Sequence, residues 1–140
     1  MQEANLEIPK HEFTMLCDDV RKEFGGKTSI MGLYDHHISV PEVPYTLPKI
    51  CFYTRFSNIR GIFKFNFSII SPSGERRDIV CDSDIEIPDG AKEGTFSIVV
   101  SPFDIVSDGI YEVIIALTKG DDSFEYIYKF AVCNNSSAVD

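Results

Sequence analysis

The feature that most constrains the fold of this chain is a two-residue alternation of apolar and polar side chains. In GIFKFNFSII, residues 61–70, four apolar side chains fall on one face: Phe63, Phe65, Phe67 and Ile69. Successive side chains of a β-strand point to opposite faces of the sheet, so this pattern is typical of a half-buried strand. The sequence contains no apolar stripe of useful length with helical spacing. The alternation therefore predicts an all-β fold.

Four further segments also have strand-like sequences. Residues 49–57 (KICFYTRFS) and 123–132 (SFEYIYKFAV) alternate in the same way. In the second of these, Tyr126 and Tyr128 belong to the apolar face, and we expect that face to point into the core. Residues 95–100 (TFSIVV) and 109–118 (GIYEVIIALT) carry apolar side chains on both faces, which is expected of central strands.

The sequence between these segments is typical of turns. Gly, Pro, Asp and Ser gather at residues 71–75, 88–94 and 119–123. Residues 41–48 (PEVPYTLP) hold three prolines, which predicts an extended crossover and not a paired strand. Eight or nine short strands with one such connection predict an antiparallel β-sandwich with Greek-key character. We expect one domain at residues 11–133, with flexible tails at 1–10 and 134–140.

One local motif points to a particular kind of sandwich. SDGIYEV, residues 107–113, resembles the tyrosine corner of immunoglobulin-like domains, in which a tyrosine bonds back to upstream backbone. Tyr111 would be that tyrosine. Val113 stands where antibody-type domains have a cysteine, and the chain has no tryptophan. The motif therefore indicates immunoglobulin-like architecture alone.

Charge and composition narrow the function classes. A net charge of −9 argues against binding to a nucleic-acid backbone, which requires clustered Lys and Arg. We find neither a signal-peptide pattern nor an apolar run long enough to span a membrane, so we expect a cytoplasmic protein. The four cysteines form no CxxC pair, and in that compartment we expect reduced thiols: Cys17, Cys51, Cys81 and Cys133.

Residues 17–37 (CDDVRKEFGGKTSIMGLYDHH) contain many residue types that can bind metal. His36 and His37 are adjacent, so on a strand they point to opposite faces and cannot easily share an ion. We predict instead a β-hairpin that reverses at Gly25–Gly26, with residues 13–18 on its incoming arm. Gly32 is expected to permit a bulge or a close backbone approach.

We also expect particular surroundings for Arg21, within this segment, and for His11, before it. Arg21 is expected to lie under the proline-rich crossover, where bonds to a carboxylate and to carbonyl groups would anchor the hairpin to the sandwich. His11 lies beside Glu12 near the start of the chain, and we expect it to be exposed.

Six loop aspartates are weak calcium candidates, because calcium binds six to eight oxygen ligands and sandwiches can hold it in end loops. Each is also a common turn residue, and their spacing matches no complete calcium motif. They are Asp82, Asp84, Asp104, Asp108, Asp121 and Asp122. No nucleophile elbow or phosphate-binding loop occurs, so we predict no enzyme activity and no cofactor.

The first third of the chain contains, in this order, CDDVR, then GKTSIMGLY, then VPEVPYTLPK. This order resembles an uncharacterised bacterial and phage family, a domain of unknown function. The matching residues are Cys17, Asp18, Val20, Arg21, Gly26, Lys27, Ser29, Gly32, Tyr34, Pro41, Pro44, Leu47, Pro48 and Lys49. The resemblance implies a small cytoplasmic β-sandwich and transfers no activity to any residue.

From these observations we expect a non-enzymatic module that binds another protein through a sheet edge or an end loop. The resemblance adds a phage or mobile-element setting in which the module would inhibit or modulate a host system. One alternative is an ion- or small-ligand-binding domain that uses the aspartate-rich loops. Another is a structural subunit that forms homo-oligomers.

Overall fold

The computed structural model describes residues 8–35, 37–91 and 93–135, and in this part of the chain twelve β-strands and no helix occur. The larger sheet has the order β4 (His37–Val40), β12 (Asp122–Asn134), β11 (Gly109–Lys119), β7 (Gly61–Ile70), β8 (Arg76–Ile87). The second sheet has the order β1 (Lys10–Cys17), β6 (Ile50–Ser57), β9 (Glu93–Val100). Two further pairs are β5 (Tyr45–Leu47) with β10 (Phe103–Ile105), and β2 (Asp19–Glu23) with β3 (Lys27–Met31).

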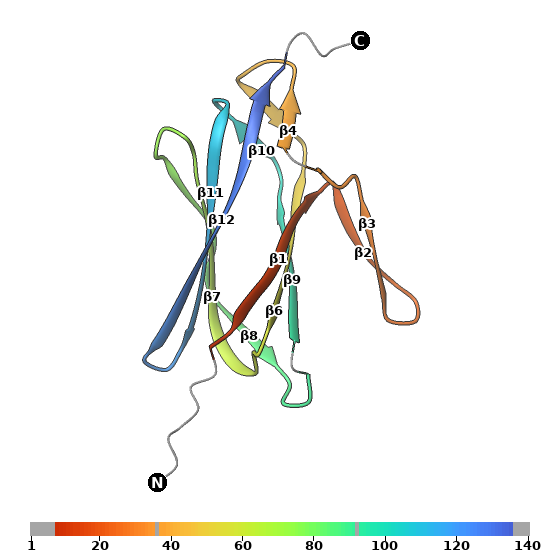
Figure 1. Cartoon of the computed structure of the whole chain (residues 1–140), viewed down its shortest axis with the longest axis vertical. Coiled ribbons are helices and arrows are strands. Elements are labelled where there is room, and N and C mark those ends of the chain that lie inside the picture. Colours follow the sequence, from red (N-terminus) through yellow and green to blue (C-terminus); the bar gives the residue numbers. More distant parts are fainter. Residues whose placement is uncertain (1–7, 36, 92, 136–140) are drawn as a thin grey trace.

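The two larger sheets lie face to face and enclose the core (Figure 1). The ring of Phe52 on β6 lies 5.1 Å from that of Phe67 on β7 and 5.8 Å from that of Phe130 on β12. Aromatic pairs at such distances add to the free energy gained by apolar burial. The alternating apolar face of residues 61–70 is buried, so the all-β prediction and this strand are confirmed.

The strand number and strand direction differ from the prediction of eight or nine antiparallel strands. β4 runs parallel to β12, so the larger sheet is mixed. The additional strands are three to five residues long, which is too short for an alternation to stand out in the sequence.

The proline-rich segment 41–48 is not a simple crossover, because Tyr45–Leu47 pairs with Phe103–Ile105. Pro44 and Pro48 flank the short strand and do not interrupt it, so its three backbone N–H groups remain available for the ladder. The prediction that this segment would stay unpaired is therefore wrong.

β9 also differs from its predicted place. It pairs with β6 alone among the described strands, so it is an edge strand and not a central one. Its β-branched residues suit any strand, and Val99 on its outer face is 53% exposed. By contrast, β11 lies between β12 and β7, so the prediction of a central strand is confirmed for this segment.

The ends of the described chain belong to the domain. Lys10 begins β1 and Asn134 ends β12, inside the segments predicted as tails. The hydroxyl of Tyr126 donates a hydrogen bond to the carbonyl of Pro9, and the backbone N–H of Asn135 donates to the carbonyl of Val40 at 2.9 Å. Residues 1–7 and 136–140 of the predicted tails lie outside the described residues.

Candidate functional site

The β2–β3 hairpin extends away from the two packed sheets (Figure 1). Its strands are in register from Asp19 opposite Met31 to Glu23 opposite Lys27, and among the described strands each pairs only with the other. The chain reverses at Gly25 and Gly26, which have φ angles of 89° and 79°, so the predicted reversal is confirmed. The predicted incoming arm is wrong for residues 13–17, because β1 pairs with β6.

An aromatic side chain lies at the tip of this hairpin. Phe24 is fully exposed, and Met31 and Leu33 near the hairpin base are 46% and 47% exposed. The strands carry three basic and two acidic residues, in a chain that is acidic overall. Sequence reasoning did not single out Phe24. The available signal was an aromatic residue directly before a Gly-Gly reversal, where polar residues are usual.

The hairpin leaves the sandwich at a compact set of contacts between Asp18, Gly32 and Tyr34, which we call the hairpin junction. The N–H of Asp18 donates to the carbonyls of Met31 and Gly32 at 2.9 and 3.2 Å. The N–H of Tyr34 donates to the carbonyl of Leu16 at 2.9 Å, and its hydroxyl donates to Oδ1 of Asp18 at 3.4 Å. Burial is the main cause that raises the pKa of Tyr34, so the hydroxyl keeps its proton.

Gly32 allows the two arms to approach at the hairpin junction. Its φ is +66°, and a Cβ at this position would lie 2.2 Å from Oδ2 of Asp18. The predicted close approach at Gly32 is therefore confirmed.

The ion pair of Lys49 links the hairpin to a residue outside it, whereas the ion pair of Arg21 lies within the hairpin. Nζ of Lys49 lies 3.0 Å from Oδ1 of Asp19, and Nε of Arg21 lies 3.0 Å from Oδ2 of the same carboxylate. These two cations, Lys49 first, hold the pKa of Asp19 below its usual value. The prediction that the proline-rich crossover covers Arg21 is wrong, because the Arg21 side chain remains 64% exposed. Its partner Asp19 stands two positions away on the same face of the strand.

Cys17 and Cys51 face each other in the β1–β6 ladder beneath the hairpin. All four cysteines are free, as predicted, and these two are buried. Sγ of Cys51 donates to the carbonyl of Asp18 at 3.5 Å, which adds a contact at the hairpin base. Burial raises the pKa of Cys17 to about 11, so its thiol is protonated at neutral pH and poorly suited to nucleophilic attack.

His11 is half-buried, and the prediction that it is exposed is wrong. Its ring lies 5.2 Å from that of Phe56, and its Nε2 lies 2.7 Å from Oγ1 of Thr14. Thr14 in turn lies 2.9 Å from Oγ1 of buried Thr54. Desolvation is the main cause that lowers the pKa of His11, since the charged ring would lose water contacts.

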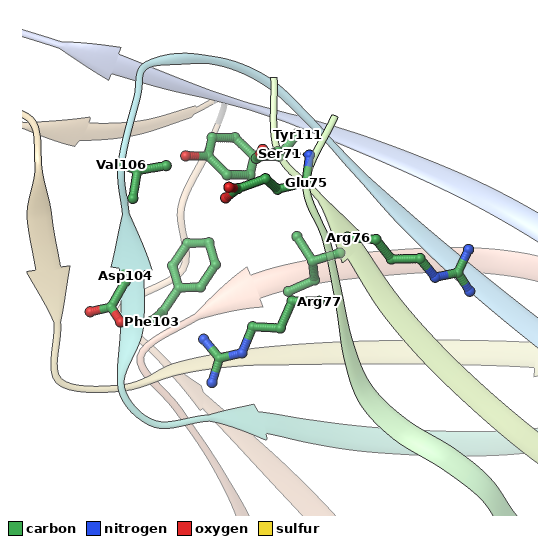
Figure 2. A pocket seen from close by; sticks show the side chains of 9 residues that line it. Ser71, Glu75, Arg76, Arg77, Phe103, Asp104, Val106 and Tyr111 are labelled. Carbon is green, nitrogen blue, oxygen red and sulfur yellow. Dashed lines mark hydrogen bonds between the residues drawn. The ribbon is translucent and has the colours of Figure 1, made fainter. Parts of the chain in front are cut away.

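A hollow of about 570 Å³ opens beside β10, between the β7–β8 turn and the start of β11. Figure 2 shows the rings of Phe103 and Tyr111 in this hollow, with Glu75 and Arg77 reaching over it and Arg76 turned away. Because acidic and basic side chains both contribute, the hollow has no single charge preference.

The predicted tyrosine-corner bond is present next to this hollow. The hydroxyl of Tyr111 donates to the carbonyl of Ser107 at 2.7 Å.

Pro48, one of the residues that carry the family resemblance, accepts a hydrogen bond at 2.8 Å from the hydroxyl of Ser101 through its carbonyl. Gly26 and Lys27 lie at the hairpin reversal. Since Cys17, Asp18 and the residues up to Tyr34 lie in the hairpin or at its base, most of the residues that carry the resemblance belong to this part of the chain.

The six candidate aspartates do not converge. Asp82 and Asp84 lie on β8, Asp104 on β10, Asp108 before β11, and Asp121 and Asp122 at the β11–β12 turn. Several already have protein partners: Asp84 pairs with Lys64 at 2.7 Å, and Asp104 accepts a bond from Thr46 at 2.8 Å. Within residues 8–35, 37–91 and 93–135, no group of three or more potential metal ligands comes together. His36 lies outside these residues.

Comparison with known proteins places the chain in a family. A model described as "Family of unknown function (DUF6941)" matches residues 12–131, from β1 to β12, so the chain belongs to this family. No curated protein matches the chain. In the described residues, no helix is long and apolar enough to cross a membrane.

Proposed function

We propose that this member of the DUF6941 family is a non-enzymatic protein-binding module that contacts its partner through the β2–β3 hairpin. The observation that carries the proposal is the fully exposed ring of Phe24 at the hairpin tip. Transfer of a phenylalanine side chain from water into an apolar pocket contributes about 1.5–3 kcal/mol. Aromatic residues inserted into pockets are typical of the few side chains that supply most of the affinity of an interface.

The hairpin junction supports the same proposal. Backbone hydrogen bonds from Asp18 and Tyr34 fix the base of the hairpin, and the Lys49–Asp19 ion pair adds a contact from outside it. A preorganised element loses less conformational entropy on binding than a flexible loop. The predicted partner is therefore a protein with an apolar pocket that accepts one aromatic side chain.

The architecture proposed for the module is an immunoglobulin-like sandwich, which the bond from Tyr111 to Ser107 supports. A cytoplasmic location is consistent with the four free thiols. From the resemblance we further propose a phage or mobile-element origin, with a host protein as the partner that is inhibited or modulated.

Capture from a lysate of the source cells tests the proposal if three immobilised proteins are compared. Phe24→Ser removes the ring, and Ile127→Ser removes another exposed apolar side chain on β12 as a matched control. We expect the native protein and I127S to retain the same partner and F24S to retain at least tenfold less. Equal retention by F24S, with an unchanged melting temperature, would exclude the hairpin as the contact surface.

A small-ligand-binding function is the second candidate, and the hollow beside β10 favours it. Asp104 is the one candidate aspartate among the residues that line this hollow. Thermal unfolding in calcium and in a chelator tests whether the protein binds calcium. An identical melting temperature in both solutions would exclude calcium binding. Light scattering on the purified protein tests the homo-oligomer alternative, which a monomeric mass would remove.

A further inference from the structure

A second hollow, of about 450 Å³, runs along the side of the sandwich between β8 and β9. Its lining is mainly apolar and comes from both sheets. The apolar side chains are those of Phe65, Ile79, Val80, Ile85, Phe96, Ile98 and Val99. β8 and β9 are joined by the short segment 88–92, and each lies at the edge of its own sheet. The hollow is therefore an open side of the core between two sheet edges.

The two edges differ in their ability to accept another strand. The pairing of β8 with β7 shifts register on both sides of Phe67, and Asp82 on β8 has a positive φ of 47°. Such irregularity blunts an edge. β9 is regular, because its eight residues pair with β6 in unbroken register from Glu93 to Val100.

The regular edge has backbone groups available for pairing. Along an edge strand, every second residue directs its N–H and C=O away from the neighbouring strand. Among the described strands β6 is the only partner of β9. An extended segment beside β9 would gain main-chain hydrogen bonds and could place alternate side chains into the hollow.

The acidic residues of the two edge strands, which we call the rim, indicate what the segment should carry. Asp82, Asp84 and Glu86 lie along β8, and Glu93 begins β9. Asp84 is paired with Lys64, whereas Glu86 and Glu93 are exposed and have no ion pair among the described residues. A second copy of the chain would add the same acidic residues, and its β9 contains no cation. The rim therefore favours a basic segment over self-association.

We infer that β9 accepts an extended segment of a partner protein in which apolar side chains alternate with Lys or Arg. The apolar side chains enter the hollow beside Phe96 and Ile85, and the basic side chains face Glu86 and Glu93. This surface is separate from the hairpin tip, so it does not depend on Phe24.

The test uses the full chain and a nine-residue peptide in which Lys alternates with Val. A Glu–Val peptide of the same length is the comparison probe. Glu86→Lys with Glu93→Lys reverses the rim, and Glu42→Lys with Glu125→Lys gives the same net charge elsewhere on exposed positions. Binding is measured by calorimetry, and amide hydrogen exchange locates it.

We expect the Lys–Val peptide to bind and to protect β9 amides, with affinity at least tenfold lower for the E86K/E93K variant and unchanged for the E42K/E125K variant. F24S should bind the peptide as the native protein does, which separates this site from the hairpin. No binding, equal affinities for the two double variants, protection that omits β9, or equal binding of the Glu–Val peptide would each overturn the inference. A dimer in the absence of peptide would assign the edge to a second copy.

Discussion

Substitution of Gly32 by alanine should release the hairpin from the sandwich. The backbone there has a φ of +66°, and the new methyl group would lie 2.2 Å from Oδ2 and 2.6 Å from Cγ of Asp18. These distances are far inside van der Waals contact, so the carboxylate side chain must rotate away. Its hydrogen bond from the Tyr34 hydroxyl is then lost.

The cost has two parts. A non-glycine residue in the left-handed region costs about 1–2 kcal/mol. Displacing the Asp18 side chain, with loss of a long hydrogen bond, adds about 0.5–1.5 kcal/mol. We therefore expect the free energy of unfolding to fall by about 1.5–3.5 kcal/mol, unless the hairpin detaches first.

Urea unfolding measures the total, and hydrogen exchange at the amide of Tyr34 detects detachment of the hairpin. Gly74→Ala is the matched control, because Gly74 has a φ of +92° and no atom within 4 Å of the added Cβ. It should show the backbone cost alone. In an Asp18→Ala background the cost of G32A should fall toward that of G74A. Equal costs for G32A and G74A, with unchanged exchange at Tyr34, would refute the steric reasoning.

Three further outcomes follow from the core and its titratable groups. Phe67→Ala empties a fully buried position and should destabilise the fold by about 3–5 kcal/mol in urea unfolding, and a cost below that of an exposed substitution would contradict the core assignment. Because burial lowers the pKa of His11, the unfolded chain binds its proton more readily, so stability should be full above pH 6.5 and decline as pH falls through the folded pKa. His11→Gln should flatten that part of the stability profile, and an unaltered slope would show that another group causes it. Under native conditions at pH 8, a thiol reagent should modify exposed Cys81 rapidly and Cys17 only after unfolding; equal rates would contradict the burial that raises the Cys17 pKa to about 11.

The long strands could be predicted because the alternation of apolar and polar residues lies within each strand. Residues 63–69 alternate over seven positions, and the buried face follows the pattern. The Gly25–Gly26 reversal was also local, since glycine allows the positive φ that the turn requires. These features depend on neighbours in sequence, which a single sequence displays.

The features that sequence reasoning missed depend on distant partners. β5 is three residues long, and its pairing with β10 joins Thr46 to Asp104 across 58 positions. His11 is half-buried because Phe56 and Tyr126 cover it, and neither is near it in the chain. Short-range patterns contain no information about such contacts, so sequence reasoning assigned the segments a plausible local structure that the fold overrides.

The candidate site also combines local features that could be predicted with non-local contacts that could not. The sequence identified residues 17–37 as unusual, but it suggested a ligand cluster or a fold signature and not a projecting surface. The deciding facts are non-local: Lys49 reaches Asp19 from outside the hairpin, and Cys51 contacts the carbonyl of Asp18 from β6.

The contacts at the hairpin base indicate what this segment requires from its sequence. An exposed ion pair such as Lys49–Asp19 contributes only about 0–1 kcal/mol, so stability alone is a weak reason for its presence. Together with the backbone bonds at Asp18 and Tyr34, it limits the directions that the hairpin can take. A fixed direction is what the proposed function requires, because the Phe24 ring would have to enter a pocket of the partner. If the hairpin contacts a partner as proposed, the polar contacts at its base orient the tip more than they stabilise the sandwich.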